Sequence, residues 1–172
     1  MTEINNKKFF IKILSSIPIF LLFISALNEF DFNYLGLKYF SFNFIYILIF
    51  YHSLKKTKSL GYGLIFIAGL INDVVVGTPV GISSLIYLLI CGAAAYLRNI
   101  TLRPSLIKDW IFFLVTILVV NSFSYILLTF IFLYKLEYTY LLFNTSFTFI
   151  FYLLFSYIFN FIEKRLIGNQ NA

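Results

Sequence analysis

Three side chains of this sequence belong to the types that carry acid–base or metal chemistry and lie in or beside apolar runs: Asp73, His52 and Cys91. Asp73 lies within an apolar run, where an ionisable group is costly and usually faces a protein interior or a cavity. Catalysis inside a membrane needs a second carboxylate or a histidine-based metal set at the reaction centre. The sequence has one His, one Cys and a single embedded carboxylate, so we expect no enzyme, no metal site and no cofactor.

The spacing around Asp73 indicates close packing of two helices. Gly69, Asp73 and Gly77 are spaced i, i+4 and i+8, so they lie on one face of a helix. After the breaker Gly77-Thr78-Pro79-Val80-Gly81 we expect a second helix. This helix carries a stripe of small residues at Gly81, Ser84, Gly92 and Ala95. Such stripes let helix backbones approach closely inside a membrane.

Two roles are open for Asp73. In the structural role it accepts hydrogen bonds from backbone N–H groups of the turn at Gly77-Thr78-Pro79, where Pro79 has no N–H of its own. In the other role it is a proton or ligand site. Asp73 lies about 18 Å along the helix axis from Gly61, away from the membrane midplane, which favours the structural role. That role predicts that Asp73→Asn keeps the fold and that Asp73→Leu destabilises the hairpin.

Composition places the chain among polytopic membrane proteins. Of its 172 residues, 61% are hydrophobic and only 12% are charged, and a soluble domain of this length could not bury so much apolar surface. We expect one transmembrane domain over residues 1–172. The net charge of +6 does not indicate nucleic-acid binding, because the basic residues stand at the ends of apolar runs.

The apolar runs predict six membrane-spanning helices, at about residues 13–27, 39–54, 61–76, 80–97, 110–134 and 138–162. With this alternation all but two of the 13 basic residues fall on one side of the membrane, the exceptions being Lys38 and Lys135. The basic side holds Lys7, Lys8, Lys12, Lys55, Lys56, Lys58, Arg98, Arg103, Lys108, Lys164 and Arg165. The positive-inside rule therefore predicts that both termini lie in the cytoplasm.

The central stretch resembles the MreD family, the rod shape-determining integral membrane proteins of bacteria. The family pattern has a glycine, apolar residues, aspartate, a short gap and then glycine, any residue, proline, an aliphatic residue and glycine. The sequence matches it at Gly69, Asp73, Gly77, Pro79, Val80 and Gly81. The match covers about a quarter of the chain. A proline that often precedes the second span is missing, and residues 38–42 read Lys-Tyr-Phe-Ser-Phe, which leaves the start of that helix open.

The resemblance implies a non-catalytic scaffold of the cell-wall elongation machinery in the bacterial cytoplasmic (inner) membrane. The implied partners are MreC and, through it, RodA, a class B penicillin-binding protein and MreB filaments. Membrane lipid surrounds such a protein, and homodimer formation is left open. The implied architecture is similar to that of the substrate-binding subunits of energy-coupling-factor transporters.

Two other classes of membrane protein have a similar length. The alternative to a scaffold is a vitamin-type, small-molecule-binding subunit of an energy-coupling-factor transporter, whose pocket would draw on Asn72, Asp73, Thr78 and Asn144. Lipoprotein signal peptidase has a similar length, but it needs a second intramembrane aspartate. The polar patch at residues 144–148 is interpreted as helix–helix hydrogen bonding rather than as a ligand site.

Overall fold

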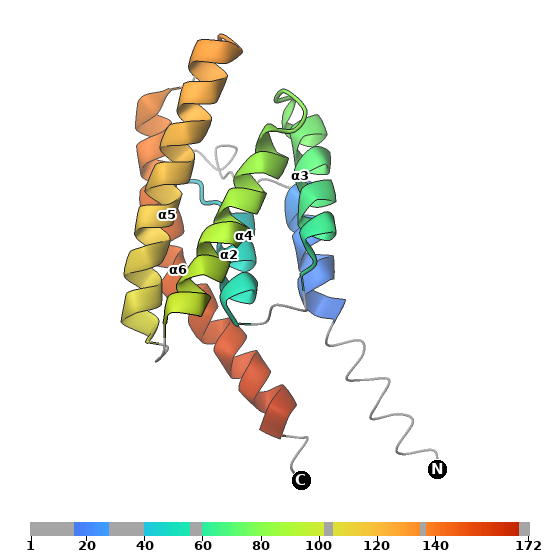
Figure 1. Cartoon of the computed structure of the whole chain (residues 1–172), viewed down its shortest axis with the longest axis vertical. Helices are drawn as coiled ribbons and strands as arrows, with labels where there is room; N and C mark the ends of the chain where they lie inside the picture. Colours follow the sequence, from blue (N-terminus) through green and yellow to red (C-terminus); the bar gives the residue numbers. More distant parts are fainter. Residues whose placement is uncertain (1–15, 28–39, 56–59, 102–104, 135–136, 169–172) are drawn as a thin grey trace, which may run out of the picture.

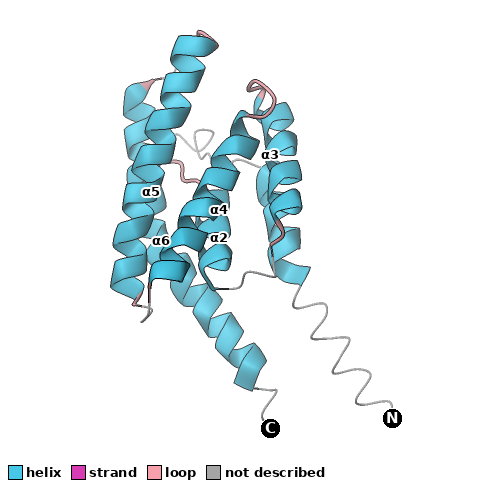
Figure 2. Ribbon diagram, viewed as in Figure 1, coloured by secondary structure: helices cyan, strands magenta, loops and turns pink. Residues whose placement is uncertain are grey.

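The computed structural model of the chain describes residues 16–27, 40–55, 60–101, 105–134 and 137–168, with side chains described as far as Glu163. Every regular element in these residues is a helix, as Figure 2 shows, so the predicted all-α class is confirmed. Several basic residues used in the topology argument lie outside the described residues: Lys7, Lys8, Lys12, Lys38, Lys56, Lys58, Arg103 and Lys135.

The helices follow one another in alternating directions along the long axis of the molecule (Figure 1). They are Ser16–Leu27, α2 (Phe44–Lys55), α3 (Tyr62–Val76), α4 (Ile82–Ile100), α5 (Leu106–Ile126) and α6 (Tyr138–Gly168), and α5 continues into the π-helical turn η2 (Leu127–Ile131). Three helical segments are long and apolar enough to cross a membrane, namely Ile82–Ile100, Leu106–Ile131 and Tyr138–Glu163. The remaining three helices are apolar but shorter.

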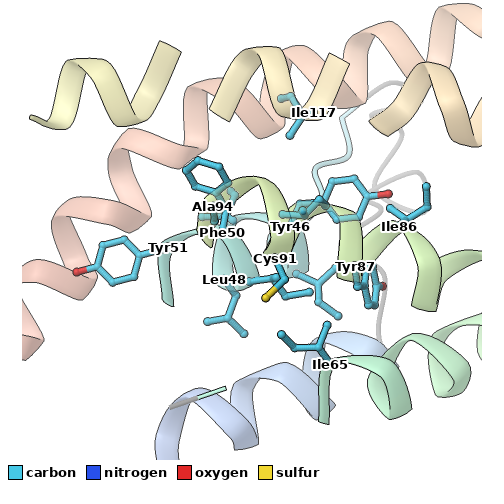
Figure 3. Close-up of a cluster of buried hydrophobic side chains, with 14 of the residues drawn as sticks. Tyr46, Leu48, Phe50, Tyr51, Ile65, Ile86, Tyr87, Cys91, Ala94 and Ile117 are labelled. Carbon is cyan, nitrogen blue, oxygen red and sulfur yellow. The ribbon is translucent and has the colours of Figure 1, made fainter. Parts of the chain in front are cut away.

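The centre of the molecule is α2, which the other helices surround. Its sequence is apolar in every direction around the helix axis, and all of its residues except His52 and Lys55 are buried. A helix of this kind can only be accommodated inside a protein or a membrane. α2 packs on α4 and on α6, and Phe50 lies against the rings of Phe113 and Tyr152. Figure 3 shows this core, with side chains from α2, α3, α4 and α5 converging.

The second helix begins later than the sequence predicted. A start near residue 39 was expected, whereas residues 40–43 are not helical and α2 begins at Phe44. Asn43 is the last residue before the helix: its carbonyl accepts from the N–H of Ile47 at 3.5 Å, and its side chain bonds Asn144 on α6. The shortened helix is about 18 Å long at 1.5 Å per residue, less than a hydrocarbon core of about 30 Å.

The non-helical segment before α2 finds its partners on α6. The N–H of Asn43 donates to Thr148 Oγ1 at 2.9 Å, and its side-chain amide donates to Asn144 Oδ1 at 3.1 Å. Asn144 in turn donates to Ser41 Oγ at 2.9 Å. Irregular backbone at membrane depth is tolerated only where protein satisfies it. The polar patch on α6 therefore bonds other parts of the chain, namely this non-helical segment and, through Thr145, Asn121 of α5, where the sequence predicted helix–helix hydrogen bonds.

Candidate functional site

The motif around Asp73 forms the turn between α3 and α4. Gly77 ends α3 in the left-handed region at φ 76°, and Gly81 precedes α4 at φ 104°, so both positions favour glycine. The carbonyl of Asp73 accepts from the N–H groups of Gly77 at 2.9 Å and Thr78 at 3.0 Å. Pro79 follows where the backbone leaves the helix, and its carbonyl accepts from the N–H of Ile82 at 3.3 Å.

The Asp73 side chain, which is fully buried, supplies the cap that α4 lacks. Gly81, the N-cap residue of α4, has no side chain with which to bond the first N–H groups of that helix. Asp73 Oδ2 accepts from the N–H of Gly81 at 2.6 Å, and Oδ1 accepts from the N–H of Ser83 at 2.9 Å and the hydroxyl of Thr78 at 3.0 Å. A carboxylate at this place also interacts favourably with the helix dipole.

These bonds differ in one respect from the sequence-based expectation. The backbone donors were expected before Pro79, within Gly77-Thr78-Pro79, but they belong to Gly81 and Ser83, after it. Asp73 therefore holds the start of the following helix as well as the turn. The prediction that Asp73→Asn keeps the fold stays a prediction. Both carboxylate oxygens are occupied as acceptors and an amide offers only one acceptor oxygen, so we expect the asparagine to weaken the cap.

Asn72, next to Asp73, joins three helices. Its amide donates to the carbonyl of Ala26, at the end of the Ser16–Leu27 helix, at 3.2 Å. Its oxygen accepts from the hydroxyl of Tyr87 on α4 at 2.8 Å. The sequence offered Asn72 only as a polar group for a ligand pocket, and its structural role could not be read from spacing because both partners are distant in sequence.

The closest approach between α3 and α4 is at Gly69. A Cβ atom built there would overlap the backbone Cα and N of Ser84 and lie 2.7 Å from its Oγ. Ser84 is itself fully buried and donates from its hydroxyl to the carbonyl of Phe66 at 2.8 Å. Glycine at position 69 and a small residue at position 84 are therefore both needed for this packing, as membrane helix pairs commonly require.

The sequence predicted that the small residues of α4 pack closely against a neighbouring helix. Within the chain this prediction is wrong at Gly81 and Gly92. A Cβ atom at Gly92 or at Gly81 would meet nothing within 4 Å. Gly81 precedes the helix and serves the turn. Gly92 lies eight residues beyond Ser84, which rotates it by about 80° from the α3-facing side at 100° per residue. It lies instead on an exposed face with Leu85, Leu89 and Tyr96.

The polar groups proposed for a ligand pocket are engaged elsewhere. Asp73 and Thr78 form bonds of the α3–α4 turn, and Asn72 joins α3 to the Ser16–Leu27 helix and to α4. Asn144 is bonded to the segment before α2. Among the described residues no hydrogen bond connects the two places. No group of three or more His, Cys, Asp or Glu side chains suited to a metal ion occurs in the described part of the chain.

A second buried carboxylate escaped the sequence analysis. Asp109 is only 3% exposed in the first turn of α5, and the charge of Lys55 at the end of α2 acts on it. The fifth span was expected to begin at Trp110, but α5 begins at Leu106 and includes Asp109. Nearby, Arg98 of α4 donates to the carbonyl of Ser53 at 2.7 Å. Side chains from α4 and α5 thus surround the last turn of α2.

Comparison with known proteins supplies one match. A family model described as rod shape-determining protein MreD matches residues 7–167, nearly the whole chain. No curated protein and no solved structure gives a significant match.

Gly69 in α3 and Gly92 in α4 provide a matched test of the α3–α4 contact. Gly69→Ala should lower the free energy of unfolding by about 1–3 kcal/mol, because the added Cβ forces α3 away from Ser84. Gly92→Ala should leave stability unchanged or raise it by up to about 1 kcal/mol, since that position is open and alanine favours the helix. Thermal unfolding in one detergent measures both. Equal loss in the two variants would contradict this account of the hairpin.

Asp73 provides a graded test of the cap. Asp73→Asn should lower the free energy of unfolding by about 2 kcal/mol, because one acceptor is replaced by an NH₂ group that faces a donor. Asp73→Leu should cost more, since it removes all three bonds. Unfolding in detergent should show stability falling in the order wild type, Asp73→Asn, Asp73→Leu. A fully stable Asp73→Leu protein would show that the cap is dispensable.

Proposed function

Because the chain belongs to the MreD family of rod shape-determining membrane proteins, we propose that it is a non-catalytic scaffold of the bacterial cell-wall elongation machinery that binds MreC within the cytoplasmic membrane. The observation that carries this proposal is the family match over residues 7–167, which includes the whole Asp73 turn. Through MreC the scaffold connects to RodA, a class B penicillin-binding protein and MreB. Residues 1–172 act as one transmembrane domain in this proposal.

The distribution of polar groups supports a role exercised through helix surfaces. The embedded groups Asn43, Asn72, Asp73 and Asn144 all bond other parts of the same chain. The outward faces of the helices are apolar, with exposed Phe66, Leu89, Val119, Phe130 and Tyr157 among them. Such faces suit contacts with lipid and with membrane helices of other proteins.

Within this proposal the exposed face of α4 is the contact for a partner helix. Gly92 has no packing role inside the chain, yet glycine within a helix costs about 1 kcal/mol relative to alanine. Its place between Leu89 and Tyr96 would let another helix approach the α4 backbone closely. The single span of MreC is the proposed occupant, and a second copy of this chain is the competing one.

The proposed topology has six spans with both termini in the cytoplasm. The alternating helix directions support it (Figure 1). The described charged residues Lys55, Arg98, Lys108 and Glu163 belong to the helix ends at the side where both termini are expected. α2 takes part in this topology as a short helix that is lengthened by protein-bound backbone at residues 40–43.

Reporter fusions test the topology. Fusions placed after residues 57, 101 and 172 should all report a cytoplasmic location, because each position lies on the predicted side that holds all basic residues except Lys38 and Lys135. A fusion after Gly77 should report the opposite side and serves as the matched control. A non-cytoplasmic signal from any of the first three positions would contradict the six-span arrangement.

Co-purification tests the scaffold and the α4 contact together. The tagged chain, extracted in mild detergent from bacteria with an elongation machinery, should recover MreC. Gly92→Leu should remain folded and lose most of that recovery, because its side chain fills the proposed contact. Val119→Leu, at another exposed apolar position on α5, should retain it.

The proteins recovered by co-purification also distinguish the proposed scaffold from a transporter subunit. Recovery of a coupling subunit with ATPases, in place of MreC, would support a substrate-binding subunit of an energy-coupling-factor transporter. Recovery of a second copy that is lost in Gly92→Leu would assign the α4 face to a homodimer.

A further inference from the structure

Contacts near one end of the bundle place three helices at a common level. Arg98 in the last part of α4 donates to the carbonyl of Ser53 in the last turn of α2. Phe50 of α2 packs on Phe113 of α5 with ring centroids 5.0 Å apart, and because the two helices run in opposite directions, Asp109, four residues before Phe113, lies near the level of Ser53 and Lys55. The level of Arg98, Lys55 and Asp109 can therefore serve as a common origin from which the lengths of α4 and α5 are measured.

From this level α4 and α5 reach different heights. α4 extends from Arg98 back to the turn at Gly81, about 25 Å at 1.5 Å per residue. α5 with η2 extends from Asp109 to Ile131, about 33 Å by the same rise. Figure 1 shows the end of α5 projecting beyond the α3–α4 turn. Measured from this level, α5 with η2 is longer than a hydrocarbon core of about 30 Å, whereas α4 up to the turn is shorter than it by about 5 Å.

The turn is held largely by hydrogen bonds within the chain. Within residues 77–83 the N–H groups of Gly77, Thr78, Gly81, Ile82 and Ser83 have acceptors in the chain, Pro79 has no N–H, and the N–H of Val80 has no acceptor there. The carbonyl of Gly77 accepts from the hydroxyl of Tyr134 at 2.7 Å. A turn at the water surface needs no such partners, whereas in hydrocarbon each unsatisfied group costs several kcal/mol.

The side chain at the tip of the turn is apolar and exposed. Val80 is 71% exposed. Tyr134 reaches the turn from the segment after η2, which places the end of α5 above the turn. Leu133, beside Tyr134, is 82% exposed at that end.

We propose that the α3–α4 turn lies at the depth of the lipid acyl chains, with Val80 in contact with lipid, while the end of α5 reaches the water interface. The length difference between the helices, the largely internal hydrogen bonding of the turn and the exposed valine together support this depth. The Asp73 cap then has a specific purpose, because it lets a chain reversal take place without water. The inference holds whichever side of the membrane this end faces.

Cysteine accessibility measures the depth. The variants Val80→Cys and Leu133→Cys are reconstituted in phosphatidylcholine vesicles with 18-carbon monounsaturated chains and exposed to a charged, membrane-impermeant thiosulfonate. Both positions lie at the same end of the protein, so mixed orientation in the vesicles affects them equally. The wild-type chain gives the background, because its Cys91 is buried. Val80→Cys should react at least about tenfold more slowly than Leu133→Cys, since a charged reagent enters hydrocarbon poorly.

Varying the bilayer thickness shows whether lipid or the protein itself shields the thiol of Val80→Cys from the reagent. With 14-carbon chains the rate at Val80→Cys should rise toward that of Leu133→Cys, and with 22-carbon chains it should fall further. Equal rates at the two positions in 18-carbon bilayers would overturn the proposal by placing the turn in water. A slow Val80→Cys rate that does not change with chain length would overturn it too, because the protection would then come from the protein. Thermal unfolding of both variants verifies that they are folded.

Discussion

The arrangement of the helices depends on one carboxylate, Asp73, which holds the beginning of a helix to which it does not belong. α4 follows a glycine and has no side-chain cap of its own, so the N–H groups of Gly81 and Ser83 would be unsatisfied without the Asp73 oxygens. α4 in turn packs on α2, α3 and α5. The position of α4 therefore sets the surface against which the central helix α2 is buried. The contact of Gly69 with Ser84 also holds α3 against α4, at a point further from the turn.

Polar contacts between distant parts of the chain hold the remaining helices. Asn121 of α5 donates to Thr145 of α6 at 2.7 Å, and Tyr51 of α2 donates to Asn160 of α6 at 2.9 Å. Lipid gives no hydrophobic driving force for helices to associate, so close packing and hydrogen bonds of this kind must hold them together. Trp110 shows the same pattern, because its indole donates to the carbonyl of Phe149 and its ring stacks on the Phe149 ring.

The sequence predicted the helices and the turn because both are encoded locally. Apolar runs, the Gly-Thr-Pro-Val-Gly breaker and an isolated aspartate are visible without any knowledge of partners. The contact of Gly69 was predictable for the same reason. Gly92 was misassigned because eight residues are not a whole number of helical turns. Asp109 was missed because α5 begins before the apolar run does, and the start of α2 depended on Asn43 and on partners about a hundred residues away.

The segment before α2 has a consequence for how the protein is made. Asn43 is synthesised early, yet Thr148, which accepts from its N–H, lies 105 residues later in the chain. Asn144, which pairs with its side chain, also comes late. During most of translation this non-helical backbone is without its native acceptors, and α2 is too short to cross a bilayer alone. The second helix can therefore reach its final environment only after the last helix has left the ribosome, so the order of synthesis is not the order of assembly.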